Sequence, residues 1–400
     1  MEWEIEKELS LLDLDEDVFY RSFQTLSKGE QTKVLLAAMF LKENAFLLID
    51  EPTNHLDMEG RQKLSNYLRK KKGFVLISHD RSFLDNCVDH ILSINKTNIE
   101  IQKGTFSSWW NNKELRDAFE IAEDEKLKKD IGRLSASAKR TSSWSDHVEN
   151  SKYSNTNSGS KIDRGYVGHK AAKMMKRAKS IETRKLNLLE EKSKLRKNIE
   201  TSEDLALFPI QFHDRKLVEL VDLSILYDDK IICDGINLTI EQGDRIALRG
   251  KNGCGKSSLL KLINNENIMY QGTVRKNNHL TISYVSQDTS GLYGSLSEFA
   301  SLHRIEENLL KSMLRKLDFS REQFDKKLED FSGGQKKKVL IAKSLCEKAH
   351  LYLWDEPLNF VDVISRMQLE NLLIEHQPTI LFVEHDHAFC ENVATKVFQF

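Results

Sequence analysis

Long apolar runs, an export signal and paired cysteines are all lacking in this 400-residue chain. No stretch of 18 or more consecutive apolar residues occurs, so the sequence predicts no membrane-spanning helix. The first residues, Met1–Glu6, are acidic and lack the basic and then apolar pattern of an export signal. The five cysteines show no Cys-x-x-Cys spacing, which favours a reducing compartment over disulfides or zinc. We therefore expect a cytoplasmic protein.

A glycine-rich loop is lacking from the first of two otherwise matching segments. The tripeptide Asp-Glu-Pro occurs at Asp50–Pro52 and again at Asp355–Pro357, each time 23 residues after the serine of a Ser-x-Gly motif. A His-Asp pair follows each glutamate by 28 or 29 residues, which makes an internal repeat of about 305 residues. The sequence thus predicts two nucleotide-binding halves. We expect the first to lack its beginning and, because Phe400 matches Ile94 in the repeat, the second to lack its end.

Both halves show the pattern of an α/β sheet with crossover helices. In residues 1–110, apolar spacing predicts a helix at Thr32–Lys42, and the continuous apolar runs Phe46–Ile49 and Phe74–Ile77 predict parallel strands buried on both faces. The same alternation returns in residues 216–400.

Residues 111–215 lie between them, and from about Asn112 to Ile199 this stretch is rich in Lys and Glu, with sparse apolar residues and no strand-like run. It predicts two long helices in an antiparallel hairpin, each of about 28 residues and therefore about 40 Å long. The Ser/Asn/Gly segment Ser151–Ser160 predicts a loop, and we place the tip of the hairpin near residues 144–168.

Positive charge is concentrated around that tip. Residues 131–180 contain eleven Lys or Arg against three Asp or Glu, an excess of eight, although the whole chain has a net charge of −1. A run of charge is often a solvated helix face. Here it has one sign and is interleaved with Trp144, Tyr153 and Tyr166, which is typical of a surface that binds RNA. The aromatic side chains would either stack on bases or brace the hairpin.

The segment Gly250–Ser257 matches the phosphate-binding loop pattern in full and lies between a predicted strand and an apolar helix. Its backbone N–H groups would surround the phosphates of ATP, Lys256 would reach the β and γ phosphates, and Ser257 would ligate Mg²⁺. The apolar strand Leu351–Asp355 ends in a carboxylate suited to Mg²⁺, and Glu356 follows as the group that would orient the attacking water.

Four further motifs accompany the loop. The first signature segment, Leu26–Gln31, and the second, Phe331–Gln335, each place a Ser-Gly turn at a predicted helix N-terminus, where it would bind a phosphate from another domain. Gln287 and His385 each follow a predicted strand. The residues predicted to bind nucleotide are Ser27, Gly29, Glu30, Tyr227, Gly250, Lys251, Asn252, Gly253, Cys254, Gly255, Lys256, Ser257, Ser258, Ser332, Gly333, Gly334 and Gln335. Those predicted to act in catalysis are Glu51, His79, Gln287, Glu356 and His385, and those predicted to ligate Mg²⁺ are Asp50, Ser257, Gln287 and Asp355.

This order of motifs resembles the ATP-binding-cassette superfamily, and two cassettes joined by a charged helical linker resemble its ABC-F branch. Within that branch, the stretches Glu51–Asp57, Arg164–Arg177 and Trp354–Asp362 are similar to the lincosamide, streptogramin A and pleuromutilin resistance proteins. The resemblance implies two P-loop NTPase cassette domains, ATP hydrolysis with Mg²⁺, and sites that join one half's loop to the other half's signature. It also implies binding to the ribosome, with the linker tip near the ribosomal RNA of the peptidyl-transferase centre.

Three alternatives stay open on the residues alone. A translation factor of the same branch without a resistance role would share every motif. The ATPase subunit of a membrane transporter would share the cassette motifs but seldom carries a basic hairpin. A DNA-repair ATPase has an insertion that interrupts one cassette, whereas this hairpin joins two.

Overall fold

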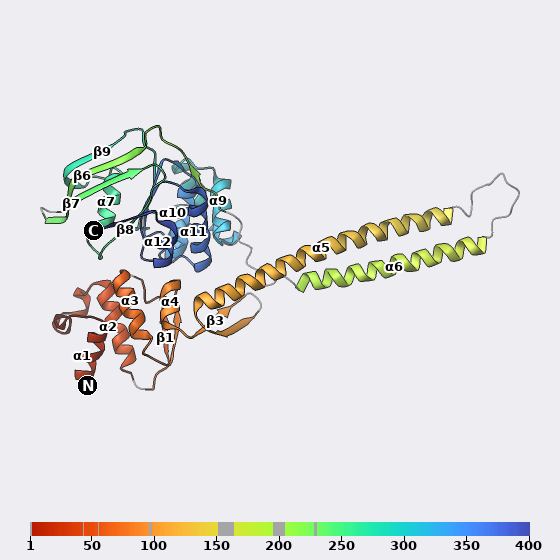
Figure 1. Cartoon of the computed structure of the whole chain (residues 1–400), viewed down its shortest axis with the longest axis horizontal. Coiled ribbons are helices and arrows are strands. Elements are labelled where there is room, and N and C mark those ends of the chain that lie inside the picture. The colour runs from red at the N-terminus through yellow and green to blue at the C-terminus, as the bar shows by residue number, and fades with distance from the viewer. Residues whose placement is uncertain are drawn as a thin grey trace. The chain divides into compact units, whose positions relative to one another are not determined.

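The computed structural model describes residues 2–42, 44–54, 56–95, 98–150, 164–194, 205–227 and 230–400. They form two compact units, one of residues 1–88 with 202–400 and one of residues 89–201 (Figure 1). The predicted α/β architecture with a long helical hairpin is confirmed.

The helices of the first unit are α1 (Glu2–Leu11), η1 (Glu16–Tyr20), η2 (Phe23–Thr25), α2 (Lys28–Phe40), α3 (Met58–Leu68), α4 (Arg81–Cys87), α7 (Lys256–Ile263), α8 (Leu296–Leu302), α9 (Glu307–Lys316), η4 (Arg321–Asp325), η5 (Leu328–Asp330), α10 (Gly333–Cys346), α11 (Val363–His376) and α12 (His387–Val393). Its strands are β1 (Leu47–Asp50), β2 (Phe74–Ile77), β5 (Phe208–Pro209), β6 (Lys216–Tyr227), β7 (Lys230–Glu241), β8 (Arg245–Arg249), β9 (Met269–Lys276), β10 (Ile282–Val285), β11 (Lys348–Ala349), β12 (Leu351–Asp355), β13 (Ile380–Val383) and β14 (Lys396–Gln399).

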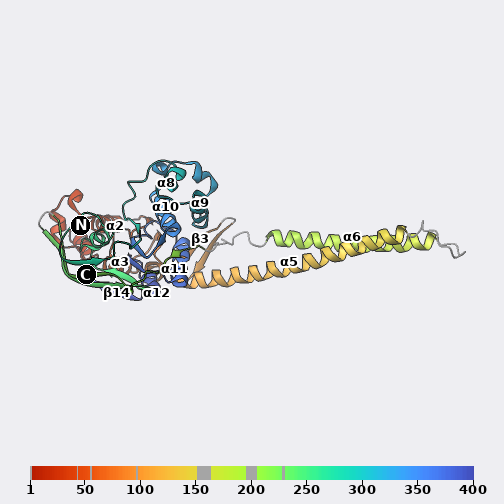
Figure 2. The same ribbon diagram turned by 90° about the horizontal axis from the view of Figure 1, so that it is seen from above.

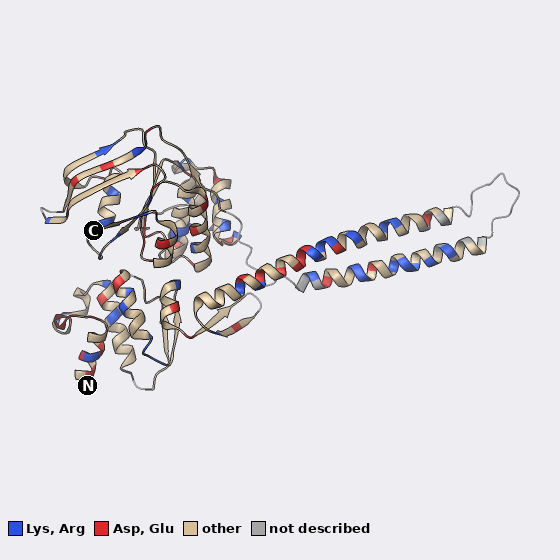
Figure 3. Ribbon diagram, viewed as in Figure 1, with Lys and Arg blue, Asp and Glu red and all other residues tan. Residues whose placement is uncertain are grey.

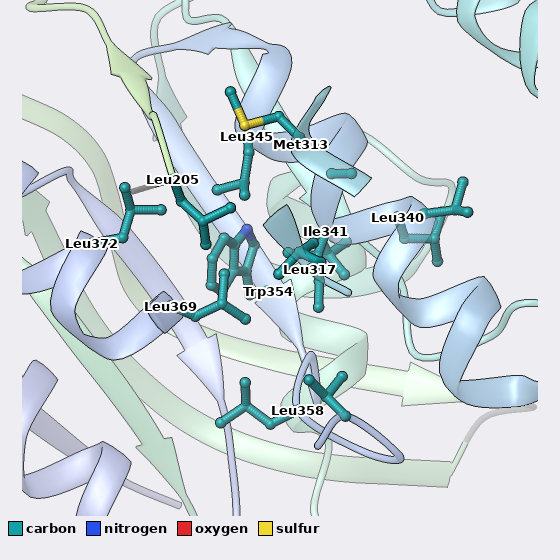
Figure 4. Close-up of a cluster of buried hydrophobic side chains, with 14 of the residues drawn as sticks. Leu205, Met313, Leu317, Leu340, Ile341, Leu345, Trp354, Leu358, Leu369 and Leu372 are labelled. Carbon is teal, nitrogen blue, oxygen red and sulfur yellow. The ribbon is translucent and has the colours of Figure 1, made fainter. Parts of the chain in front are cut away.

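The C-terminal half is built on a five-stranded parallel sheet of order β10-β12-β13-β8-β14. Every residue of β12 and β13 is buried, as the continuous apolar runs require. On one face, Trp354 lies among leucines from the covering helices, with Leu345 on α10 and Leu369 on α11 (Figure 4). Its indole Nε1 donates to the Ser344 hydroxyl at 3.0 Å, so the ring is buried without an unpaired donor.

The other face of that sheet is covered by α7 and by the antiparallel sheet β7-β6-β9. Leu353 and Val383 point into this second core. The two cores hold β8 and β12 rigidly from both sides. The ends of these strands therefore have fixed positions, and the chemistry starts there.

Among the described residues up to Val88, the N-terminal half contains only the two-stranded parallel sheet β1-β2. Leu47 and Ile49 are buried against the helices, but Leu48 is 71% and Ile77 is 54% exposed. The apolar runs taken alone predict burial on both faces, but in this half one face of each strand is exposed. No described element of this half covers the outer face in the way that α7 and β6 cover its counterpart in the other half.

Helix α2 also differs from its predicted bounds, since it begins at Lys28 rather than Thr32 and ends at Phe40. Ser27 caps its N-terminus, with its hydroxyl accepting from the Glu30 N–H, while the Glu30 carboxylate accepts from the Ser27 N–H. The signature segment thus forms the first turn of the helix instead of preceding it.

The second unit consists of the β3 (His90–Ile94) and β4 (Ile99–Lys103) hairpin followed by two long helices, α5 (Phe106–Asn150) and α6 (Arg164–Lys194). The two helices lie side by side along most of α6, as Figures 1 and 2 show from perpendicular directions. The Asp124 carboxylate on α5 is buried within this unit. It lies 3.6 Å from the Lys128 ammonium and 4.0 Å from the Lys192 ammonium on α6.

The hairpin is longer than predicted. Helix α5 has 45 residues and so spans about 68 Å, rather than about 40 Å. It continues through Trp144, and α6 already contains Tyr166, so both ends of the predicted tip at residues 144–168 are helical. Residues 133–150 contain no Gly or Pro that would end a helix earlier. Tyr153 and the predicted loop Ser151–Ser160 lie outside the described residues.

Candidate nucleotide site

The phosphate-binding loop connects β8 to α7. Gly255 has a φ of 102° and precedes the helix in a left-handed conformation, where a Cβ atom would lie 3.0 Å from the Cys233 sulfur. Only glycine fits this turn without strain. The turn directs the N-terminus of α7, with its unpaired N–H groups and positive dipole end, toward the space enclosed by the loop.

Lys256 lies across the loop. Its ammonium donates to the carbonyl oxygens of Gly250 and Lys251, both at 2.8 Å, and the residue is only 6% exposed. A buried cation held by two neutral carbonyls is under-compensated, so a phosphate at this position would be bound strongly.

Asp355, at the end of β12, fits a divalent cation. The Ser257 hydroxyl donates to its Oδ1 at 3.0 Å, whereas its Oδ2 is buried and has no hydrogen-bond partner in the described part of the chain. Burial raises the pKa of Asp355 to about 6, against the opposing hydrogen bond from Ser257. The hydroxyl of Ser257, the carboxylate of Asp355 and the amide oxygen of Gln287 are the hard oxygen ligands that Mg²⁺ prefers, and a cation would supply the partner that Oδ2 lacks.

Glu356 has a different environment from its neighbour. Its Oε2 accepts from the Gln287 amide at 2.7 Å and from the Asn359 amide at 2.6 Å, and its Oε1 lies 3.5 Å from Nε2 of His385. Burial by itself raises the pKa of Glu356, but the adjacent His385 ring and the hydrogen bond from Gln287 outweigh it and hold the pKa below the ordinary value. Glu356 therefore stays ionised at neutral pH and can accept a proton from water.

Two residues near the carboxylates were missed by the sequence analysis. Asn359 follows Glu356 by three residues, and its repeat counterpart Asn54 was a signal that could have identified it. Lys337, on α10, is 2% exposed, and its ammonium donates to the carbonyl oxygens of Ser286 and Asp355. Burial lowers the pKa of Lys337, although Asp355 opposes the shift. No local motif identifies this lysine, because only the fold brings it beneath the carboxylates.

A cavity of about 770 Å³ joins these groups to the first signature segment, and it falls within the usual size range for ligand pockets. Tyr227, whose hydroxyl accepts from that of Ser258 at 3.3 Å, is at its rim. The predicted residues that line the cavity are Ser27, Gly29, Glu30, Tyr227, Lys251, Asn252, Gly253, Gly255, Lys256, Ser257, Ser258, Gln287, Glu356 and His385. Its walls also contain Lys28, Lys33 and Arg61, which the sequence analysis did not single out.

Of the remaining predicted residues, Asp355 and Gly250 contact Ser257 and Lys256, but those of the other half-site are not brought together in the same way. His79 shares a separate cavity of about 200 Å³ with Ser332, Gly334 and Gln335. Asp50 and Glu51 line neither cavity, and Asp50 is exposed whereas its counterpart Asp355 is completely buried. The structure therefore assembles one loop with one signature segment, and in the part of the chain that it describes the other predicted half-site has carboxylates without a loop.

Glu51 lacks the donors that surround Glu356. Its Oε1 is buried without a hydrogen-bond partner among the described residues, and Nε2 of His79 lies 3.6 Å away. Burial raises the pKa of Glu51 to about 7, even though the Arg366 charge opposes the shift. Burial likewise lowers the pKa of His79. Both side chains thus favour their neutral forms.

Comparisons with known proteins agree with this geometry. The chain matches the ABC transporter family over residues 2–54 and 233–359. It is 28% identical to the ATP-binding protein Uup of Buchnera aphidicola over 99% of the chain and 63% of the relative. It is 30% identical to ABC transporter F family member 2 of Arabidopsis thaliana (98% of the chain, 54% of the relative) and 28% identical to the ribosome protection protein VmlR of Bacillus subtilis (93% and 68%). The chain therefore spans between about half and two thirds of the length of these relatives.

Among solved structures, the fold is similar to that of the archaeal ribosome recycling factor aABCE1 in complex with the ribosomal stalk protein aP1. The TM-score is 0.63 at 20% identity, over 99% of this chain and 65% of that one. Within the described ranges, no helix is long and apolar enough to cross a bilayer.

Proposed function

Because the chain is an ABC-F ATP-binding-cassette protein, with two cassette domains and a long helical insert, we propose that it binds and hydrolyses MgATP and acts on the ribosome in the cytoplasm. The observation that supports hydrolysis is the cavity in which the first signature segment faces the phosphate loop and the ionised Glu356. Different residues around this cavity would then bind the phosphates, ligate Mg²⁺ and orient the attacking water.

Each group has a role that follows from its contacts. Lys256 would exchange its carbonyl partners for the β and γ phosphates. Ser257 and Asp355 would hold Mg²⁺, which would supply positive charge against the phosphate oxygens. Glu356 orients the attacking water and takes its proton, since its oxygens already accept hydrogen bonds in the ionised form.

The helical arm supports the assignment to the ribosome. Its basic residues follow both helices in Figure 3, and Trp144 and Tyr166 are each 66% exposed on the ends of those helices. Exposed aromatic rings beside cations suit RNA, whose unpaired bases stack on such rings while the phosphates neutralise the charge. We propose contact with ribosomal RNA near the peptidyl-transferase centre and protection against lincosamides, streptogramin A and pleuromutilins.

The hydrolysis proposal is tested by Glu356→Gln. Loss of the water-orienting carboxylate should lower ATP turnover by about 10² to 10⁴-fold while ATP binding changes little, because the loop that binds phosphate is intact. Lys256→Ala should weaken both. Glu375→Gln, an exposed carboxylate on α11, is the matched control and should keep the parent's kcat. A Glu356→Gln chain with an unchanged kcat would remove this residue from the mechanism.

The ribosome proposal is tested on the arm. Replacing residues 144–168 with a short Gly/Ser turn should leave ATP turnover nearly intact, since no residue of the cavity lies there, but should abolish rescue of translation that a lincosamide inhibits. If the parent binds ribosomes without rescuing translation, a translation-factor role without resistance is the correct function.

A charge-matched comparison separates RNA contact from the loss of the tip. Lys173, Lys176 and Arg177 on α6, changed together to Gln, should reduce the steepness with which ribosome binding falls with salt by about three in log–log slope. The control changes Arg69, Lys70 and Lys72, which removes the same charge outside the arm. Equal losses in both triple variants would mean that the arm has no specific part in binding.

A further inference from the structure

One buried ion pair connects the two halves of the first unit. The Arg81 guanidinium, at the start of α4, donates to Glu370 Oε2 on α11 of the other half. Their side chains are 13% and 9% exposed, and Glu370 Oε1 also accepts from the Asn392 amide at 2.6 Å. Glu370 is therefore held by α12 of its own half and by α4 of the other.

Each partner of this pair belongs to a rigid segment. Arg81 follows Asp80, whose carboxylate accepts from the buried Arg61 guanidinium at 2.8 Å. Glu370 lies one helical turn after Arg366, which makes the equivalent ion pair with Asp386 at 3.3 Å. The Arg61–Asp80 pair ties the residues after His79 to α3, and the Arg366–Asp386 pair ties the residues after His385 to α11. The Arg81–Glu370 pair then joins the start of α4 in one half to α11 in the other half.

The internal repeat predicts a second, equivalent contact, and it is missing. The counterparts of Arg81 and Glu370 are His387 and Ser65. His387 pairs instead with Glu391 on its own helix, and the Ser65 hydroxyl donates to the Gln62 carbonyl oxygen. Both residues line a cavity of about 260 Å³ beside His385. Arg81 and Glu370 thus form an ion pair between the halves, whereas their repeat counterparts line a cavity that Asp80 and Ser82 also border.

The pair is poorly explained as an element of stability. The Arg81 Nε is buried without a hydrogen-bond partner among the described residues, and an under-satisfied buried pair adds little to stability over apolar packing. What such a pair does provide is register, because any arrangement of the halves that separates the two side chains leaves a buried charge without its partner.

We propose that the Arg81–Glu370 ion pair is a positioning contact that keeps the first signature segment opposite the phosphate loop. The inference rests on the proposed function and adds to it the element that aligns the bipartite site. Neither residue lines the 770 Å³ cavity, so both act through the placement of the halves and not through contact with nucleotide.

The test uses the full chain with Arg81→Gln, with Glu370→Gln, and with the double exchange Arg81→Glu and Glu370→Arg. Each single variant should lower kcat by about tenfold, since hydrolysis needs the aligned signature segment. The Kd for ATP should stay within about twofold, because the loop lies in one half. The exchange should restore most of kcat, because the Asn392 amide can present either its oxygen or its nitrogen to residue 370. Arg275→Gln, which breaks the exposed Arg275–Glu219 pair within one half, is the control and should change neither constant.

Hydrogen exchange supplies a readout that needs no ATPase activity. In the single variants, α4 and α12 should exchange about tenfold faster while β6 and β9 are unchanged, and the double exchange should restore protection. A normal kcat together with normal hydrogen exchange in both single variants would overturn the proposal. A lowered kcat and lowered protection that the double variant Arg81→Glu and Glu370→Arg does not recover would overturn it as well. If the parent chain hydrolyses no ATP, the proposed function fails. The hydrogen-exchange measurement then still decides whether the ion pair holds the two halves together.

Discussion

At the scale of single residues, the two catalytic-type glutamates show how far environment outweighs motif. Glu51 and Glu356 occupy the same place in the repeat, and both have a left-handed backbone, with φ of 44° and 47°. Glu356 accepts from Gln287 and Asn359, which stabilises its charged form. Glu51 has no such donor on its buried oxygen, so burial dominates and its pKa rises to about 7.

This contrast predicts opposite effects of pH on stability. The unfolded Glu51 ionises near 4.5 but the folded one only near 7, so its unfavourable contribution appears as pH rises through that window. Glu51→Gln should then stabilise the nucleotide-free chain by about 1 to 2 kcal/mol at about pH 8, allowing for solvent screening, and by much less near pH 4. Thermal unfolding at both pH values measures this.

Glu356→Gln is the comparison. Its pKa is lowered, so its stabilising contribution is present above about pH 4.5 and disappears as pH falls. This variant should be less stable than the parent at about pH 8. If both substitutions shift the midpoint in the same direction, the two environments are not as different as the contacts indicate.

At the scale of elements, the two signature segments are both helix caps. Ser27 and Ser332 each accept from the N–H three residues on, and Glu30 or Gln335 closes the capping box. Such a serine has a structural role before any nucleotide binds, so the loss of activity in a serine variant would be ambiguous taken alone. The repeat provides the control, because only Ser27 lines the large cavity.

We therefore predict that Ser27→Ala and Ser332→Ala each reduce the free energy of unfolding by about 1 kcal/mol, as the loss of a cap requires. Only Ser27→Ala should also lower kcat, by about tenfold or more, because it removes a donor to the phosphate. Urea titration and steady-state turnover measure the two effects. Equal losses of activity in both variants would show that the second signature segment also serves a working site.

At the scale of the whole molecule, the described residues contain one complete set of the groups that we propose bind ATP. The loop, Ser257, Asp355 and Glu356 come from the C-terminal half and the facing signature segment from the N-terminal half. The other set has His79 and the second signature segment around a cavity of about 200 Å³, and its Asp50 is exposed to solvent.

The expected stoichiometry is one tightly bound ATP per chain, because helix α7 and its loop supply the backbone donors that hold phosphate. Equilibrium dialysis of the Glu356→Gln chain, in which turnover does not deplete the ligand, measures the number directly. Lys256→Ala should abolish the binding that is observed. Two tight sites per chain would contradict the single-site arrangement.

The sequence determined the local chemistry of this protein. Spacing alone located the phosphate loop, the strand that ends in Asp355 and both signature segments, because a buried parallel strand and a glycine turn have strict composition. The helical hairpin could also be predicted, but the ends of its helices could not, because a Ser- and Lys-rich sequence is as compatible with continuing a helix as with ending it.

Only the tertiary structure decided which of the repeated residues face a common space. Lys337 lies beneath Asp355 because α10 packs on β12, and Leu48 is exposed where its counterpart Leu353 is buried under α7. The Arg81–Glu370 pair spans 289 residues of sequence and has no equivalent in the repeat. Long-range packing sets the dielectric and the donors around each group, and identical motifs therefore acquire different pKa values, exposures and roles.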